Sequence, residues 1–70
     1  MKIDGGRSFS EAMRIRGLST AQVAADFKVY RQQVDRWKRN KDMRLSRVMI
    51  FSRYFSYHVL DFLKLGASDD

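Results

Sequence analysis

Two helical patterns near the middle of the chain are joined by almost no intervening sequence. The first, TAQVAADF (20–27), carries an apolar edge, and the second, VYRQQVDRWKR (29–39), keeps its apolar residues to one side. Because the junction is only about three residues, FKV (27–29), which overlap the ends of both stretches, the two helices must pack against each other across a tight turn. The residues that we expect at their contact are Val23, Ala24, Phe27, Val34 and Trp37.

A further helix is predicted before this pair, and residues 1–7 are predicted to form a flexible arm. The segment SFSE (8–11) has the Ser-x-x-Glu spacing of a capping box, so the helix should begin near Phe9. It should end at Gly17, because glycine adopts at little cost the left-handed conformation that closes a helix. The segment STAQ (19–22) repeats the capping spacing and marks the start of the next helix. The arm contains paired glycines, which are typical of loops.

The second half of the chain predicts two more helices. Asn40 is a candidate left-handed end for the helix before it, and Asp42 is a candidate cap for a helix in RLSRVMIFSRYF (44–55). A short fifth helix follows in SYHVLDFLKLG, capped by His58, before an acidic tail at residues 67–70. A β-hairpin is the alternative for RVMIFSRYFSYHV, which is rich in β-branched and aromatic residues. Its poor alternation and the lack of a hairpin turn argue against that alternative.

These patterns predict an all-α fold, a compact five-helix domain over residues 8–66. Seventy residues make one domain, and without cysteine its stability must come from side-chain packing. Besides the helix contact described above, the residues expected to face the core are Phe9, Ala12, Met13, Ile15, Leu45, Val48, Met49, Phe51, Phe55, Val59, Phe62 and Leu63.

The net charge narrows the class of partner. A formal charge of +6 on seventy residues favours a polyanion, nucleic acid first and an anionic membrane surface second. Apolar runs such as VMIF are far shorter than the roughly 20 residues that span a bilayer, and the first residues lack the apolar middle of a signal peptide. We therefore expect a soluble, cytoplasmic protein without a membrane partner.

The spacing within residues 20–37 fits a helix-turn-helix unit, whose second helix lies in a DNA major groove. Counted from Thr20, the fourth, fifth, tenth, fifteenth and eighteenth positions are Val23, Ala24, Val29, Val34 and Trp37. At these points GLSTAQVAADFKVYRQQVDRWKRNKDMRL resembles the Cro and lambda-repressor family of phage regulators, and VYRQQV is particularly Cro-like. YFSYHVLDFLKLG looks like the fifth helix of the family. The resemblance covers roughly residues 10–66 and implies a lambda-repressor-like fold.

One position departs from the family pattern. The family usually has glycine at the turn position that Lys28 occupies. Either the lysine adopts a left-handed conformation, at a cost of about 1 kcal/mol, or the turn differs slightly.

The resemblance implies which side chains reach base edges. The family uses the first residues of the recognition helix and one a turn later, and the chemistry here agrees, because arginine can pair bidentately with guanine and glutamine with adenine. The base-reading candidates are Tyr30, Arg31, Gln32, Gln33, Asp35 and Arg36. Asp35 is unusual as an acid on such a surface. It either accepts from cytosine N4 or holds a neighbouring arginine extended, and we favour the second role. The arginines within reach are Arg31, Arg36 and Arg39.

The family also contacts the DNA backbone at the start of the second helix and in the loop after the third. Backbone N–H groups at a helix start and cationic side chains suit phosphate, and such contacts position a protein without reading sequence. The residues at these places are Ser19, Thr20, Arg39, Asn40, Lys41 and Arg44.

A homodimer is expected, because one domain of this size contacts little DNA. Two copies would read a palindromic operator with half-sites roughly 34 Å apart, and dimerisation either precedes DNA binding or occurs only on DNA. It requires apolar surface left over from the core. The candidates are Ile50, Tyr54, Tyr57, Leu60 and Leu65.

No catalytic or metal-binding constellation is evident, so we expect no enzyme activity, no cofactor and no small-molecule ligand. His58 has no cysteine or second histidine to complete a metal site, and the serines lack a base partner. Trp37 could stack on single-stranded bases, but its place beside Val34 favours a core position.

The function expected from these features is a sequence-specific, double-stranded DNA-binding transcriptional regulator, a phage or prophage repressor of the Cro type. An activator or an antitoxin could use the same helix-turn-helix. From other classes, the alternatives are an RNA- or single-strand-binding module and a basic amphipathic protein for a membrane or protein partner. The lack of interleaved aromatic residues on the polar face argues against the first, and the concentration of charge on one motif against the second.

Overall fold

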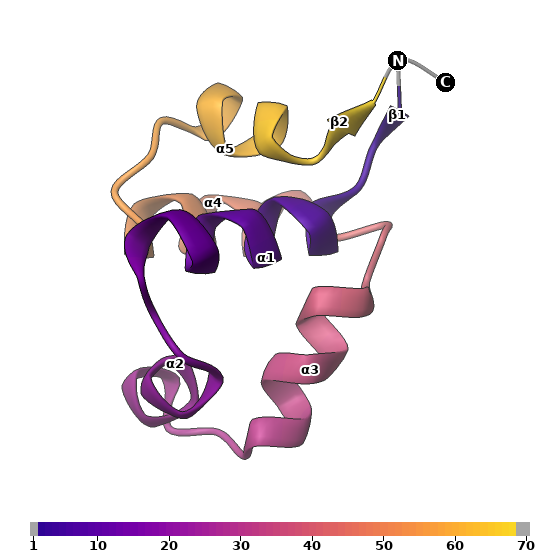
Figure 1. The fold of residues 1–70 in the computed structure, drawn as a ribbon. Coiled ribbons are helices and arrows are strands. Elements are labelled where there is room, and N and C mark those ends of the chain that lie inside the picture. Colours follow the sequence, from indigo (N-terminus) through magenta and orange to yellow (C-terminus); the bar gives the residue numbers. More distant parts are fainter. Residues whose placement is uncertain (1, 69–70) are drawn as a thin grey trace.

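Five helices and a short pair of strands make up the part of the chain that the computed structural model describes, residues 2–68 (Figure 1). Their bounds are β1 Lys2–Ile3, α1 Gly5–Arg16, α2 Thr20–Phe27, α3 Arg31–Arg39, α4 Leu45–Tyr54, α5 Val59–Leu65 and β2 Ala67–Ser68. The prediction of a mostly helical chain is confirmed. The hairpin considered for residues 47–59 does not form, because α4 and α5 occupy that region. The strands pair antiparallel, with Lys2 opposite Ser68 and Ile3 opposite Ala67.

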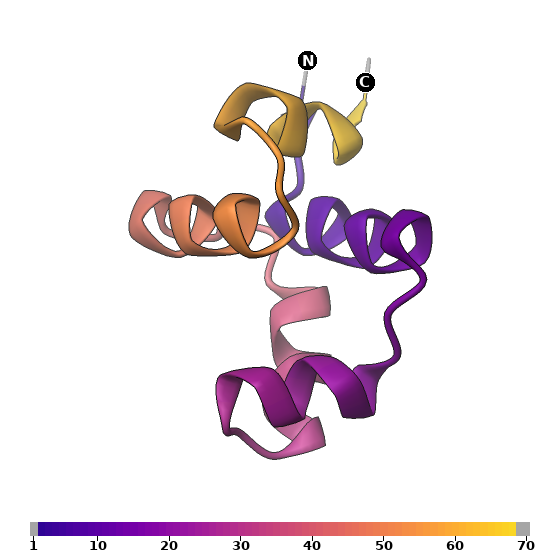
Figure 2. The same cartoon turned by 90° about the vertical axis from the view of Figure 1, so that its left-hand side faces the viewer.

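The helices are arranged in three levels (Figure 2). The middle level holds α1 and α4, with α5 on one side of them and α2 and α3 on the other. α1 packs against both outer levels through its contacts with α5 and α3, and α2 packs against α3. None of the helices described here combines the length and apolar character that crossing a bilayer requires.

Aromatic rings fill the core within the middle level and between that level and α3. The ring centroid of Phe9 lies 4.6 Å from that of Phe51 and 5.4 Å from that of Phe55, both with an edge toward a face. Trp37 lies 4.9 Å from Phe51. Such tilted contacts are favourable because ring edges are electropositive and ring faces electronegative. Of the predicted core residues, the structure buries Phe9, Ala12, Met13, Val23, Ala24, Val34, Trp37, Val48, Phe51, Phe55 and Phe62, and partly buries Phe27, Val59 and Leu63.

Three residues expected in the core are exposed instead. Ile15, Leu45 and Met49 have 47%, 66% and 48% of their surface accessible. In α4 the inward stripe runs through Val48 and Phe51. Leu45 is the first residue of that helix and precedes the stripe by a turn, while Met49 lies about 100° around the axis from Val48. The buried stripe is therefore narrower than the apolar residue types suggested.

The first helix begins earlier than predicted, at Gly5. Its cap is Asp4, whose Oδ1 accepts a hydrogen bond of 3.0 Å from the backbone N–H of Arg7. Ser8 lies inside the helix, fully buried, and its hydroxyl donates to the carbonyl oxygen of Leu63 at 3.4 Å. The prediction of a flexible arm at residues 1–7 is therefore wrong for residues 2–7, which form β1, the cap and the first turn of α1.

The paired glycines mark a close contact. The N–H groups of Gly5 and Gly6 donate to the carbonyl oxygens of Lys41 and Asn40, at 3.1 and 2.9 Å. A Cβ atom on Gly6 would lie only 2.3 Å from the carbonyl oxygen of Lys38. Glycine is required here because the start of α1 touches the backbone at the end of α3, and no side chain fits between them.

Of the caps predicted after α3, those at Asn40 and Asp42 are wrong and the one at His58 is confirmed. Asn40 has φ −83° and ψ 93°, an extended and not a left-handed conformation. Asp42 does not cap the next helix, since the residue before α4 is Arg44 and no side chain caps it. The prediction for His58 is confirmed, because its Nδ1 accepts from the N–H of Leu60 at 3.4 Å. In the predicted acidic tail, residues 67–68 form β2, and residues 69–70 lie outside the described residues.

Candidate nucleic-acid interface

Local interactions cap α2 at both ends and so set its position in the pair that it forms with α3. The Ser19 hydroxyl oxygen accepts from the N–H of Gln22 at 3.1 Å, and the Gln22 side-chain oxygen accepts from the N–H of Ser19 at 2.8 Å. This confirms the predicted capping box. At the other end Lys28 has φ 56° and ψ 47°, so the lysine does adopt the left-handed conformation. The turn therefore keeps the geometry that glycine normally provides.

The inner face of α3 is apolar and anchored. Val34 is fully buried, and Trp37 retains only 7% of its surface. The Trp37 ring contacts the rings of Phe9, Phe27 and Phe51, and its N–H finds no hydrogen-bond partner among the described residues. Trp37 is thus a core residue, as predicted, and not a platform for bases.

The outer face of α3 brings most of the predicted base-reading residues together. Two open depressions lie along it, and Gln32 and Arg36 line both. Tyr30 precedes the helix with 85% of its surface exposed and makes no side-chain cap. Arg31 is exposed but lines neither depression. The residues that line at least one depression are Tyr30, Gln32, Gln33, Asp35, Arg36, Lys38 and Arg39.

The acid on this face has a different partner from the one predicted. Oδ1 of Asp35 lies 3.8 Å from Nζ of Lys38, and within residues 2–68 it forms no ion pair with an arginine. None of the three arginines that Asp35 was expected to hold forms an ion pair within residues 2–68. The pair is more than half exposed on the Asp35 side, so its own contribution to stability is small.

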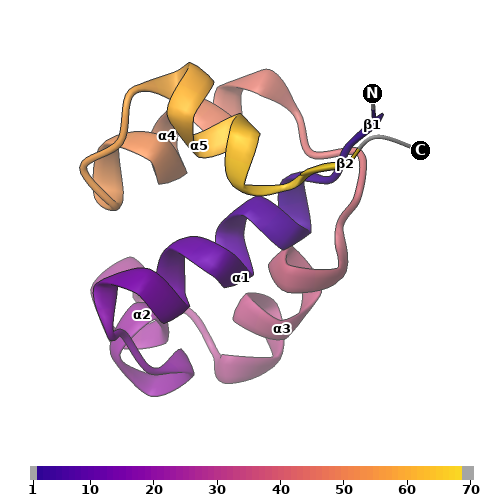
Figure 3. The same ribbon diagram turned by 45° about the horizontal axis from the view of Figure 1, so that its top comes forward.

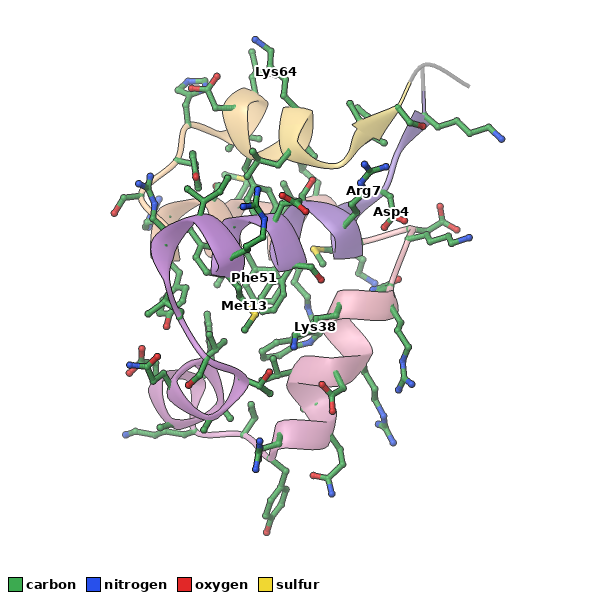
Figure 4. The ribbon with its side chains drawn as sticks, in the orientation of Figure 1. Asp4, Arg7, Met13, Lys38, Phe51 and Lys64 are labelled. Atoms are coloured by element: carbon green, nitrogen blue, oxygen red, sulfur yellow. The ribbon has the colours of Figure 1, made fainter. Side chains whose placement is uncertain are left out.

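Lys38 is a residue that the sequence reasoning did not assign to the site. Its Nζ donates a hydrogen bond of 2.7 Å to the hydroxyl oxygen of Thr20, the first residue of α2. The Lys38 side chain is 29% exposed and lies on the side of α3 that faces α1 and α2 (Figure 4). Its i+4 spacing from the buried Val34 is the sequence signal that it lies beside the inner face. It ties the start of α2 to the last turn of α3.

The predicted backbone-contacting residues form two groups. Ser19 and Thr20 stand at the start of α2, where the Ser19 hydroxyl is already used by the capping box. The second group lies at the end of α3 and in the loop after it and is exposed; it comprises Arg39, Asn40, Lys41 and Arg44. Because the carbonyl oxygens of Asn40 and Lys41 accept from the start of α1, the loop that carries this group is fixed to the core.

The predicted dimer residues do not form one equivalent set. Ile50 and Leu60 are 55% and 62% exposed, whereas Tyr54, Tyr57 and Leu65 are partly buried against the core. The Tyr54 hydroxyl donates to Asp26 Oδ2 at 2.5 Å and so links α4 to α2.

Two further contacts bear on the choice between these residues. The Arg16 guanidinium covers the Tyr57 ring, 4.2 Å from its centroid. Met49, expected in the core, lies with Ile50 and Arg53 in an apolar depression on α4. The exposed apolar surface on this side is therefore centred on Met49 and Ile50.

Burial and the Asp26 carboxylate both act on Tyr54. Desolvation of the phenolate, with the hydrogen bond to Asp26 and its negative charge in addition, raises the pKa of Tyr54 to about 12. The hydroxyl is therefore protonated, as a donor to Asp26 must be.

In residues 2–68 no group of three or more acidic or histidine side chains could hold a metal ion. Comparisons with protein-family models, with curated proteins and with solved structures gave no match to this chain.

Proposed function

We propose that this protein binds double-stranded DNA sequence-specifically and regulates transcription, with α3 in the major groove. The observation that carries the proposal is the two-sided character of α3. Its inner side is fixed by Val34, Trp37 and the Lys38–Thr20 bond, and its outer side presents exposed hydrogen-bonding groups. A rigid helix with such a face can place arginine and glutamine donors against base edges.

Charge supports the same partner. Five exposed cations lie on α3 or in the loop after it: Arg31, Arg36, Arg39, Lys41 and Arg44. No ion pair of residues 2–68 involves any of them, so each is available to a phosphate. If all five contact DNA, the logarithm of the binding constant falls with the logarithm of salt concentration with a slope of about −4 to −5.

The lambda-repressor-like fold and the Cro-type role belong to this proposal. Two copies would bind a palindromic operator with half-sites roughly one helical turn apart. Of the predicted dimer residues, Ile50 and Leu60 are best placed for the contact, because they are exposed, and the adjoining Met49 adds to the apolar surface. Repression would follow from occupancy of a promoter, and switching from the protein's own concentration and from competition with another regulator.

One observation favours a second candidate, a single-strand-binding module. The Tyr30 ring is 85% exposed at the start of α3, and an exposed aromatic ring can stack on an unpaired base. A single ring without a second aromatic residue beside it gives a weaker platform than such modules use. We therefore rank duplex DNA first.

The decisive experiment is selection of bound sites from a random-sequence duplex pool at two salt concentrations, with a single-stranded pool of the same composition in parallel. We expect an inverted repeat that survives the higher salt concentration, and less retention of the single strands. Preferential retention of single strands would replace the proposal by the second candidate. Recovery of no motif, with binding lost as salt rises, would overturn sequence-specific recognition and leave phosphate attraction alone.

A further inference from the structure

A second group of cations converges beside the end of α3. A depression between β1, the start of α1 and the loop after α3 is lined by Lys2, Arg7 and Lys41, together with Asp4 and Asp42. These charges come from three segments of the chain. We call this depression the terminal hollow, after the strands at the two ends of the fold.

The backbone fixes the terminal hollow on all sides. Lys2 is held by the pairing of β1 with β2, and the N–H of Asp4 donates to the carbonyl oxygen of Gly66 at 3.0 Å. Lys41 is held by the bond from the Gly5 N–H to its carbonyl oxygen. Figure 3 shows β1 and β2 side by side, and residues of both strands line the terminal hollow together with residues of the loop after α3. The backbone at Arg7 and Lys41 is therefore in place before an anion arrives, and that of Lys2 is in place while the strand pair is closed, which lowers the cost of binding an anion.

The two acids in the terminal hollow are not equivalent. Asp4 accepts the capping bond from the Arg7 N–H, so part of its negative charge is directed at the helix start (Figure 4). Asp42 is exposed in the loop, and its carboxylate opposes an approaching anion. Among residues 2–68, the lining of the terminal hollow holds three cations and two acids, and of these two acids only Asp42 is free of the capping role.

We propose that the terminal hollow binds a phosphate of the DNA backbone, so that the DNA-contacting surface continues past α3 onto β1 and α1. The inference rests on the proposed function, because duplex DNA supplies the phosphate. Its support is continuity: Lys41 belongs both to the loop that follows α3 and to the lining of the terminal hollow. Lys2 and Arg7 then contact the same polyanion as Lys41.

The test compares two variants with equal loss of charge, on a random-sequence duplex of about 20 base pairs. Lys2→Ala combined with Arg7→Ala removes two cations from the terminal hollow. Arg14→Ala combined with Lys64→Ala removes two from α1 and α5, and Lys64 points away from α3 (Figure 4). We expect the first variant to reduce the slope of log K against log salt by about 2, and the second to leave it within about 0.5 of the parent value.

A second, independent experiment uses a variant that is expected to bind DNA more tightly, and not one that loses binding. Asp42→Asn removes the opposing acid, and we expect binding of the same duplex to tighten about threefold at low salt. Asp61→Asn on α5 is the matched control and should have no effect. Thermal melting of each variant confirms that it is folded before binding is compared.

The outcomes separate the two proposals. If the parent protein binds duplex but the terminal-hollow variant keeps the slope of the parent, or loses no more than the control variant, the phosphate site is wrong and the proposed function stands. If Asp42→Asn leaves affinity unchanged, the site is likewise wrong. If the parent protein does not bind duplex at all, both proposals fall together.

Discussion

The ammonium group of Lys38 donates a hydrogen bond of 2.7 Å to the hydroxyl oxygen of Thr20, which joins the last turn of α3 to the first residue of α2. The connecting turn already holds the facing ends of the two helices together. This bond holds their far ends and so fixes the angle between them.

Lys38→Met should lower the free energy of unfolding by about 1 kcal/mol, because it removes this bond and keeps most of the side-chain volume. Thr20→Val should cost a similar amount, and the double variant should cost little more than either one. Urea unfolding of all four proteins measures the coupling. Fully additive losses would show that the bond contributes nothing in solution.

Gly6→Ala should be among the most damaging single changes, with a loss of about 2 to 3 kcal/mol. The added Cβ would lie 2.3 Å from the carbonyl oxygen of Lys38, so α1 and α3 must move apart. Gly17→Ala is the matched control, since Gly17 has φ 68° and no atom near the added Cβ. It should cost only about 1 kcal/mol. Equal losses in denaturant unfolding would contradict the close contact.

Lys28→Gly should stabilise the protein by about 0.5 to 1 kcal/mol. The lysine has φ 56°, a conformation that glycine adopts without the steric penalty, although glycine loses more backbone entropy on folding. Lys28→Ala keeps the Cβ atom and removes the charge, so it should be close to neutral. A rise in melting temperature for the glycine variant alone is the expected result, and a similar rise for both would point to charge instead.

Tyr54→Phe should change how stability depends on alkaline pH. The folded pKa of about 12 exceeds the usual value near 10, so the folded state keeps a proton that the unfolded state releases. The stabilisation is complete below pH 10 and is lost as pH rises to 12. We expect Tyr54→Phe to be the less stable protein at pH 9, with the difference shrinking toward pH 12. A difference that stays constant over this range would show that Tyr54 titrates normally.

Substitutions of base-reading residues and of backbone-contacting residues should change DNA binding in different ways. Arg36→Ala and Gln32→Ala should each weaken binding to the selected site by about 1–3 kcal/mol and relax base preference. Lys41→Ala should weaken selected and random duplex alike and reduce the salt slope by about one. Identical behaviour of Arg36→Ala and Lys41→Ala on both duplexes would refute the assignment of the two roles.

The parts of the fold that could be predicted from sequence depend on local interactions. The capping box of Ser19 and Gln22 and the left-handed Gly17 involve residues within one turn, so the sequence contains all the information needed. The apolar periodicity of residues 20–39 likewise predicted the buried side of α3, with Val34 and Trp37.

The predictions were wrong where a segment distant in sequence determines the local structure, as at the start of α1. Ser8 and Glu11 have capping-box spacing, but the Ser8 hydroxyl donates to the carbonyl oxygen of Leu63 in α5, and Glu11 forms an ion pair of 2.7 Å with Arg14. The competing cap, Asp4, is placed by its bond to Gly66 near the other end of the chain. No local pattern reports a contact between residues that far apart.

The candidate site divides in the same way. The outer face of α3 follows from its period, which is why Gln32 and Arg36 were predicted together. The partner of Asp35 and the inward turn of Lys38 depend on how α2 sits against α3, and the position of Lys2 depends on the strand pair. These three features depend on tertiary contacts and could not be predicted from the local sequence.

The pairing of β1 with β2 has a kinetic consequence. It closes nearly the whole described chain into a ring, and the entropy lost on closing a loop grows with loop length. The two-residue strands give few bonds in return, so this ring should close last during folding and open first under native conditions. Each opening would release Lys2 from the terminal hollow while the five helices stay folded. The outermost anion contact would then be intermittent, with a lifetime set by the breathing of the strand pair.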